Sequence, residues 1–349
     1  MRPRRRQPAA PQIVRRLRTA APGGRTVFLV HPGALPADVH RALAAALPEG
    51  SGLTVLDLSA VPEYFDAALA GGRADTTLEA LAAKLRAEFE ALPEGPVHDG
   101  RPYVLAGWSF GGVLALEMAR QMSEGRRPRR LVLLDSIAPT QAYQQPDEAL
   151  DPPLLLGWFA MYLGAKRQRR IRVFASRLAG HSAEDGLLQV LDAAVAAGAL
   201  SPDTPMPGLR KLYDTYVDGL LRNNRLTAPY RPGPAHAPIV LIKAEGSLIP
   251  EDPTLGWEEL APHGLELHTA PGDHYTMLAR QDSAEMIARL VGVVDNPAVD
   301  NPAVDNPAVD NPAVDNRAVG DSRGGDSRAD DSVAEFCPPT VPASRDRVG

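Results

Sequence analysis

The sequence has almost no cysteine, no excess of positive charge and no long hydrophobic run. The single cysteine among 349 residues, Cys337, lies in a polar stretch, which excludes a disulfide framework and argues against a cysteine-based metal site. The net formal charge of -6 supplies no basic field for binding nucleic acid. No apolar run has the roughly 20 residues of a membrane span, and none follows the basic start Met1–Arg6 as in a secretory signal. We therefore expect a cytoplasmic protein.

Both ends of the chain have the composition of unstructured polypeptide. Residues 1–24 are rich in arginine, proline and alanine, and we expect a disordered basic leader, with docking to an acidic partner as the alternative. From Asp295 the chain repeats Asp-Asn-Pro-Ala-Val every five residues, and proline at that spacing opposes both helix and central strand. We expect residues 295–349 to form a disordered tail, which leaves residues 25–294 as the folded domain.

Between these ends, apolar segments alternate with helical patterns. Short and nearly continuous apolar runs are typical of strands buried on both faces of a parallel sheet. They occupy residues 26–31, 53–58, 103–107, 131–134, 238–244 and 265–269. Stretches that indicate helices lie at 39–47, 77–92, 113–120 and 283–293. The alternation predicts an α/β fold with a mostly parallel sheet and helices on both faces.

The alternation stops between about residues 139 and 237. Helical patterns at 154–163, 187–197 and 209–221 are separated there by breaks that contain proline and glycine. An insertion of this length between two strands of a sheet is usually a lid over the functional site. We therefore expect a helical lid.

The apolar run at 103–107 leads into a G-x-S-x-G pentapeptide, Gly107-Trp108-Ser109-Phe110-Gly111, and a helical pattern follows at once. Strand, sharp turn and helix form the context of a nucleophile elbow, the turn that presents the catalytic serine of α/β-hydrolases. Ser109 is the predicted nucleophile. The backbone N–H of Phe110, at the start of the helix, is a predicted donor to the oxyanion.

A neutral serine needs a base, and the base needs an acid that orients it. Among the eight histidines, His274 lies in the loop between the last strand and the last helix, where α/β-hydrolases carry the base. Two acids compete: Asp135 ends the strand after the elbow helix, and Glu245 follows the strand at 238–244. The residues alone do not decide between them. His31 ends a strand at the same edge but precedes the serine, so we give it a supporting role at most.

A second oxyanion donor is expected in the loop after the first strand. There the segment Pro32-Gly33-Ala34 places small residues where the backbone must approach the substrate, and we predict the N–H of Ala34 as the donor. These groups carry out acyl transfer with protons and hydrogen bonds, so we expect no metal and no organic cofactor.

Taken together, these segments resemble the thioesterase domains that end modular polyketide synthases and nonribosomal peptide synthetases. The resemblance spans residues 26–293, and its motifs are Val30-His31-Pro32-Gly33-Ala34, Gly107-Trp108-Ser109-Phe110-Gly111-Gly112-Val113-Leu114-Ala115, Leu131-Val132-Leu133-Leu134-Asp135-Ser136 and Gly272-Asp273-His274-Tyr275-Thr276-Met277-Leu278. It implies an α/β-hydrolase fold, an acyl-enzyme on the serine, and Asp135 rather than Glu245 as the triad acid. It also implies a substrate, an acyl or peptidyl chain carried as a phosphopantetheine thioester on a carrier protein. The acyl or peptidyl chain would be released by hydrolysis or by cyclisation onto an internal hydroxyl or amine.

The chain departs from the family pattern at two places. Leu35-Pro36-Ala37 stands where the family often has a further glycine, so the mouth of the pocket is expected to differ. Trp108 and Phe110 are similar to the product-releasing domains that end synthases, yet no carrier domain lies between Met1 and the elbow. We therefore expect a stand-alone enzyme for a release or tailoring step, with the removal of stalled acyl groups as an alternative.

Alternatives remain open for partner and function. The basic run Lys166–Arg172 in the predicted lid is either a docking site for an acidic carrier protein or a solvated helix face. The first rival function is a carboxylesterase or lipase that uses the same groups on oxygen esters. The second is a non-catalytic module that binds acyl carriers, and the presence of Ser109, Asp135 and His274 argues against it.

Overall fold

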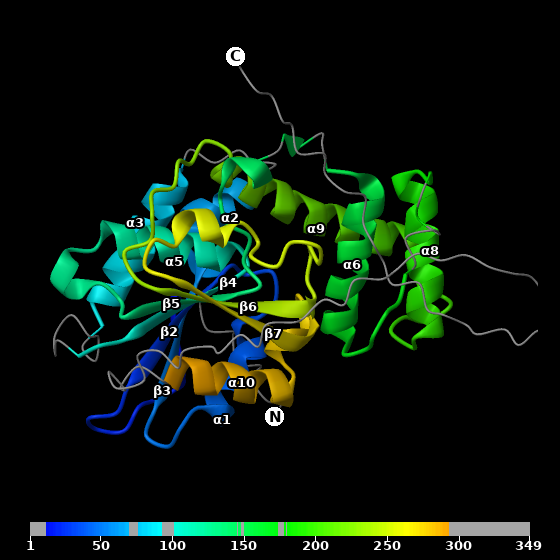
Figure 1. Cartoon of the computed structure of the whole chain (residues 1–349). Helices are drawn as coiled ribbons and strands as arrows, with labels where there is room; N and C mark the ends of the chain where they lie inside the picture. Colours follow the sequence, from blue (N-terminus) through cyan, green and yellow to red (C-terminus); the bar gives the residue numbers. More distant parts are fainter. Residues whose placement is uncertain are drawn as a thin grey trace, which may run out of the picture. The chain divides into compact units, whose positions relative to one another are not determined.

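The computed structural model describes residues 12–69, 76–92, 101–144, 146–147, 150–173, 178 and 180–292. Its centre is a seven-stranded sheet in the order β1-β3-β2-β4-β5-β6-β7 (Figure 1). The strands are β1 (Val14–Arg18), β2 (Thr26–His31), β3 (Gly52–Asp57), β4 (Val104–Trp108), β5 (Arg130–Leu134), β6 (Ile239–Gly246) and β7 (Leu265–Asp273). Strands β2 to β7 pair in parallel, and β1 pairs antiparallel with β3.

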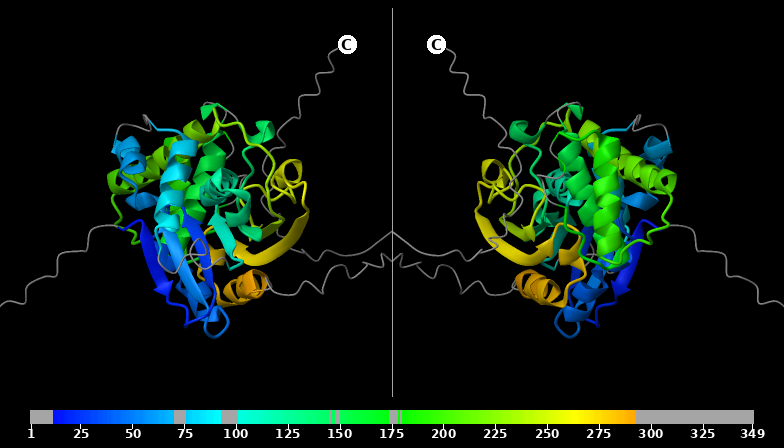
Figure 2. Two further views of the ribbon diagram at one scale, coloured as in Figure 1. Left: turned by 90° about the vertical axis from the view of Figure 1, so that its left-hand side faces the viewer. Right: turned by 90° about the vertical axis from the view of Figure 1, so that its right-hand side faces the viewer.

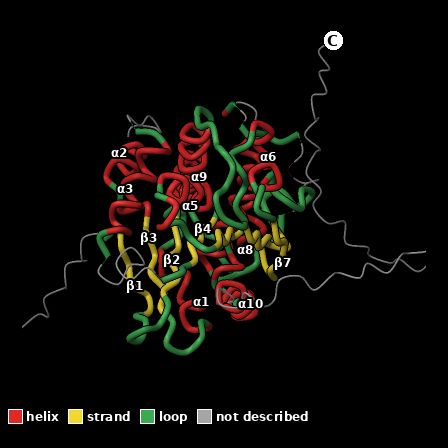
Figure 3. Tube along the Cα trace, turned by 60° about the vertical axis from the view of Figure 1, so that its left-hand side comes forward, coloured by secondary structure: helices red, strands yellow, loops and turns green. Residues whose placement is uncertain are grey.

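The strands form a sheet because their side chains are apolar toward both faces. Alternate residues of β4, such as Leu105 and Ala106, belong to two separate hydrophobic clusters, one on each face. Figure 3 shows helices α1 (Arg41–Ala46) and α10 (Gln281–Gly292) on one face, and α2 (Pro62–Leu69), α3 (Leu78–Glu90) and α5 (Phe110–Gln121) on the other. The α/β fold with helices on both faces is therefore confirmed, and it is the architecture of the α/β-hydrolases.

Among the described residues of the insertion between β5 and β6, three α-helices occur where the helical patterns predict them. They are α6 (Pro152–Arg167), α8 (Ala183–Ala196) and α9 (Met206–Thr227), and their apolar sides pack into the cluster that covers one face of the sheet. Figure 1 shows α6 and α8 side by side. Short 3₁₀ turns complete the described elements: η1 (Ala37–His40), η2 (Leu58–Ala60), η3 (Glu124–Arg126), η4 (Gln141–Tyr143), η6 (Trp257–Leu260) and η7 (Thr276–Leu278).

The predicted disordered leader is wrong for part of its length. Residues 14–18 form the edge strand β1, which pairs with β3. The arginines in this strand hid the apolar alternation, because they lie at an edge where their charged ends reach polar partners. Arg18 donates to the carbonyl oxygens of Ala44 and Leu47, at 2.9 and 2.7 Å, and so caps the end of α1. Residues 1–11 and the predicted tail at 295–349 lie outside the described residues.

The parallel pairing brings the carboxyl ends of six strands to one edge of the sheet. His31 at the end of β2 is level with Asp57 at the end of β3, and Trp108 at the end of β4 is level with Leu134 at the end of β5. The sheet twists along this order, which the side views of Figure 2 show. The edge carries the residues that follow β2, β4, β5 and β7, so segments far apart in the sequence meet there.

Candidate active site

Ser109 lies at the tip of a sharp turn between β4 and α5. Its backbone has φ 53° and ψ -130°, a region that residues with a side chain rarely adopt and that costs about 1–3 kcal/mol. The turn is tight because glycine occupies both flanks. A Cβ at Gly107 would collide with the carbonyl oxygen of Gly111, and a Cβ at Gly111 would collide with the carbonyl oxygen of Val30. The serine is thus held at the sheet edge in the conformation expected of a nucleophile elbow.

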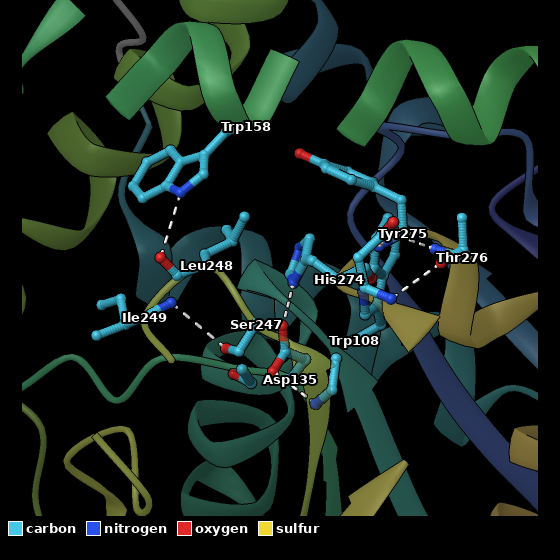
Figure 4. Close-up of polar contacts among 12 residues, drawn as sticks. Trp108, Asp135, Trp158, Ser247, Leu248, Ile249, His274, Tyr275 and Thr276 are labelled. Carbon is cyan, nitrogen blue, oxygen red and sulfur yellow. Dashed lines mark hydrogen bonds and ion pairs between the residues drawn. The ribbon is translucent and has the colours of Figure 1, made fainter. Parts of the chain in front are cut away.

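His274 and Asp135 form a buried pair beside this turn. The distance from Nδ1 of His274 to Oδ2 of Asp135 is 2.6 Å, and each residue is 2% exposed. The other carboxylate oxygen, Oδ1, accepts the backbone N–H of Ala244 at 3.0 Å. An ionised carboxylate only accepts, so Nδ1 carries the proton and Nε2 is left as the basic nitrogen. Figure 4 shows the imidazole of His274 directly above the Asp135 carboxylate.

The backbone of His274 is held on both sides. Its N–H donates to the carbonyl of Gly246 at 3.1 Å, and its own carbonyl accepts the indole N–H of Trp108 at 3.1 Å. The rings of Trp108 and His274 lie 5.3 Å apart. Because Trp108 immediately precedes Ser109, the loop that carries the histidine is locked to the elbow. Trp108 is recognisable in the sequence as part of the pentapeptide and of the family motif, but no local pattern predicts this hydrogen bond.

The two acids that the sequence left open lie in different surroundings. Asp135 is buried against His274, whereas Glu245 is exposed at the end of β6 and faces the charge of Arg280. Asp135 also has a positive φ of 42°, so the strand conformation ends at this residue. The structure therefore brings Asp135 and not Glu245 to the histidine.

The two predicted oxyanion donors belong to segments that touch. Phe110 is the first residue of α5, and an N–H in the first turn of a helix has no acceptor within the helix. Ala34 is exposed in the loop after β2. This loop meets the start of α5, because the Cα of Gly111 faces Val30 and the ring of Pro32 at close range. Both N–H groups are thus near the same strand ends.

An aromatic cluster lies between the insertion and the histidine loop. The hydroxyl groups of Tyr216 on α9 and Tyr275 are 2.8 Å apart and buried, and the ring of Tyr162 on α6 stacks on Tyr216 at 4.8 Å. Burial raises the pKa of both Tyr216 and Tyr275, so both remain neutral hydroxyl groups at physiological pH. On α6, Trp158 donates to the carbonyl of Leu248 at 3.2 Å (Figure 4). The adjacency of Tyr275 to His274 was the only sequence signal for this cluster.

A model of the thioesterase domain family matches residues 25–292. Microperfuranone synthase of Emericella nidulans is 26% identical over 274 residues, which are 75% of this chain and 27% of that protein. The non-reducing polyketide synthase atnG of an Arthrinium species is 27% identical over 209 residues, 60% of this chain and 10% of that protein. The chain thus spans about a quarter of the length of microperfuranone synthase and about a tenth of the length of the polyketide synthase.

The solved structures with a similar fold include the following two. A four-domain nonribosomal peptide synthetase matches with a TM-score of 0.55 and 27% identity, over 81% of this chain and 20% of that one. The type II thioesterase BorB, from the borrelidin biosynthetic cluster, matches with a TM-score of 0.51 over 82% of this chain and all of that one. Its identity is 18%, so this likeness concerns the fold. Across the part of the chain that the structure describes, no helix is both long and apolar enough to cross a membrane.

Proposed function

The chain belongs to the thioesterase domain family, and we propose that it releases an acyl or peptidyl chain from the phosphopantetheine thioester of a carrier protein through an acyl-enzyme on Ser109. The observation that carries this proposal is the buried pair of His274 and Asp135, joined at 2.6 Å and locked through Trp108 to the strained turn of the serine. Strain at one serine and burial of one carboxylate beside a histidine are costs that a catalytic function explains.

In the first half of the reaction, Oγ of Ser109 attacks the carbonyl carbon of the thioester. Nε2 of His274 takes the hydroxyl proton, and Asp135 stabilises the imidazolium that forms. The negative charge on the carbonyl oxygen is received by the N–H groups of Phe110 and Ala34. The carbon–sulfur bond then breaks, the sulfur takes the proton from His274, and the acyl chain remains as an ester on Ser109.

In the second half, a nucleophile attacks the ester of Ser109. Water yields a free acid, and an internal hydroxyl or amine yields a lactone or lactam. His274 takes the proton of the nucleophile and returns it to Oγ as the ester bond breaks. The same oxyanion donors act again, because the second tetrahedral intermediate has its charge at the same place.

Carrier proteins are usually acidic, and we infer that the basic end of α6 helps to dock one. Lys166 and Arg167 form the last turn of the helix, and Arg169 and Arg170 follow it in exposed positions. The Nζ of Lys166 contacts the hydroxyl of Tyr162 at 3.0 Å, so this basic end adjoins the aromatic cluster. Cations at the end of a helix also stabilise its dipole, and that simpler role predicts no effect on carrier kinetics.

Two other functions fit the same groups. A carboxylesterase or lipase would turn over free oxygen esters as well as carrier-bound thioesters, whereas a thioesterase of this kind should prefer the carrier-bound chain. A module that only binds acyl carriers would form no covalent adduct. The lone cysteine, far from the proposed site in sequence, leads us to infer a cytoplasmic enzyme.

Mass spectrometry tests the proposal directly. Wild-type protein and the variant Ser109→Ala are exposed to a short acyl thioester and digested. We expect the mass of the acyl group on the peptide that contains Ser109 in the wild type only. An adduct on another peptide, or an equal adduct in the variant, would contradict the nucleophile assignment. Carrier binding without any adduct would favour the non-catalytic module.

A further inference from the structure

Two histidines form a buried hydrogen-bonded chain behind the predicted oxyanion loop. His31 at the end of β2 is fully buried, and His40 at the end of η1 is 1% exposed. Nδ1 of His31 lies 3.0 Å from Nε2 of His40. Nε2 of His31 lies 2.6 Å from the carbonyl oxygen of Leu35. The chain therefore runs from η1 through the end of β2 to the far end of the loop.

The direction of both hydrogen bonds follows from the carbonyl group. The oxygen of Leu35 can only accept, so Nε2 of His31 carries a proton and donates. A neutral imidazole has one N–H, so Nδ1 of His31 must accept the hydrogen bond from His40. His40 is then the donor through Nε2. Each ring is neutral and in the Nε2–H form, and the order of donation is His40 to His31 to Leu35.

The surroundings keep both rings neutral. Burial lowers the pKa of His31, and burial followed by repulsion from His31 lowers the pKa of His40. Two charged groups face His31 from β3 and β1: Asp57 acts to raise its pKa and Arg15 acts to lower it. These two groups pair at 3.8 Å, and their opposite charges have opposing effects on the ring. The hydrogen bond to the carbonyl of Leu35 also acts to raise the pKa of His31, but less than burial lowers it.

The loop held by the two hydrogen-bonded histidines is short. Its end, Leu35, is buried in the core, and Ala34 immediately before it is exposed. A Cβ at Gly33 would come within 2.6 Å of Cβ of Ser59, so the loop also packs against the segment after β3. On its other side the ring of His31 stacks on Trp108, with centroids 5.4 Å apart and planes at 22°. The bond to Leu35 thus ties the loop to the residue that precedes Ser109.

We propose that His40 is a positioning residue: through His31 it holds the carbonyl of Leu35 and so aims the N–H of Ala34 at the oxyanion. This inference rests on the proposed function for its catalytic consequence. Its structural half, the directed chain of two neutral histidines, stands independently of any activity. His40 acts only through His31 and Leu35 and takes no part in making or breaking a bond.

The structural half is tested by NMR of protein labelled with ¹⁵N in its histidine rings. At pH 7 we expect both rings as the Nε2–H form, with each signal assigned from single-histidine variants. An Nδ1–H form or a charged ring at either position would overturn the proposal. The test holds whether or not the protein forms an acyl-enzyme, so its failure is separable from failure of the proposed function.

The catalytic half is tested with a matched pair of variants. In His40→Gln, the amide nitrogen replaces the donor atom Nε2, whereas His40→Leu fills the space without a donor. Loss of an entire oxyanion donor lowers kcat about 10²–10³-fold, so a donor that is present but misaimed should cost about tenfold. We expect that loss of kcat in the leucine variant, an unchanged KM, and recovery to within about twofold of wild type in the glutamine variant.

Hydrogen exchange separates a local effect from general destabilisation. In His40→Leu, the amides of residues 33–35 should exchange faster, while those of α3 keep the wild-type rate. Equal acceleration in both segments, or equal kcat in the two variants, would overturn the positioning role. If wild-type protein shows the expected tautomers and protected loop but forms no acyl-enzyme, the proposed function fails and the histidine chain stands.

Discussion

The sheet edge that carries the proposed triad and the helical insertion are held by different kinds of contact. At the edge, short directional hydrogen bonds join strand ends, as between His274 and Asp135 at 2.6 Å and between His31 and Leu35 at 2.6 Å. In the insertion, ring packing dominates, as between Phe159 and Tyr213 at 5.3 Å and between Tyr162 and Tyr216. Hydrogen bonds require one geometry, whereas apolar packing accepts many.

This difference separates chemistry from selection of the substrate. The pairing of the parallel strands fixes the positions of Ser109, Asp135 and the histidine loop, because each follows the end of a strand. The side chains at this edge therefore have little freedom to move. The insertion meets the histidine loop through ring contacts and one hydrogen bond, between the hydroxyl groups of Tyr216 and Tyr275. We infer that one catalytic edge can serve different acyl chains through changes in the insertion alone.

The largest expected effect comes from the two competing acids. Asp135→Asn should lower kcat about 10⁴-fold, because the amide favours the wrong imidazole tautomer. Glu245→Gln is the matched control at the same edge, and its exposed side chain should change kcat less than about twofold. Hydrolysis of a short acyl thioester measures both. Equal losses in the two variants would mean that burial at the edge does not select the acid.

A smaller effect is expected for charge at the basic end of α6. Reversing Arg169 and Arg170 to glutamate should lower kcat/KM for a carrier-bound substrate about tenfold at low salt, and less at high salt. The control reverses Arg126 and Arg129, which line a cavity of about 460 Å³ at the opposite edge of the sheet. This control should leave carrier kinetics unchanged. If neither double variant changed kcat/KM for the carrier-bound substrate, the basic end of α6 would be a solvated helix terminus and not a docking site.

The hydrogen bond between the insertion and the histidine loop can be removed by a single substitution. Tyr216→Phe removes the hydroxyl bonded to Tyr275 and should lower the free energy of unfolding by about 1 kcal/mol, with a few-fold change in kcat/KM. Tyr213→Phe is the control, because its ring packs on Phe159 away from the histidine loop. Urea unfolding and kinetics over a series of acyl lengths measure both variants. A larger change in stability and kcat/KM for Tyr213→Phe than for Tyr216→Phe would show that the hydroxyl of Tyr216 does not couple the insertion to the histidine loop.

The smallest effect concerns acid stability. Burial lowers the pKa of His31 and His40 in the folded state, whereas unfolded histidine titrates near about 6.5. Below that pH the unfolded chain binds more protons, so the free energy of unfolding should fall as pH drops from about 6.5 toward the folded pKa values. The free energy of unfolding of His40→Gln should fall less than that of the wild type over the same pH interval. Tyr216→Phe should keep the wild-type slope, because the insertion tyrosines do not titrate there.

Much of the site was accessible from local sequence. The elbow could be predicted because the pentapeptide and its flanking strand and helix are contiguous, and the strain at Ser109 follows from that short segment. His274 could be proposed from its place between the last strand and the last helix. The choice between Asp135 and Glu245 could not be made from local pattern, because both lie at the carboxyl ends of parallel strands and they differ in burial and in their partners.

Other features had no local signal. The strand β1 was assigned to the leader because its arginines resemble the basic residues before it, and only pairing with β3 and the bonds of Arg18 to α1 distinguish them. His40 sits in a 3₁₀ turn with no motif around it. Its contact with His31 depends on how η1 folds back over the end of β2.

The sequence by itself determined the order of the parallel strands along the chain, the strained serine turn and the small set of groups that could act on it. These follow from interactions within a few residues, where composition and spacing decide the conformation. The tertiary structure alone decided which acid meets His274, which histidines join behind Ala34 and which tyrosines reach the histidine loop. Those choices depend on burial and on atoms brought within about 3 Å from distant segments, and a linear pattern carries neither quantity.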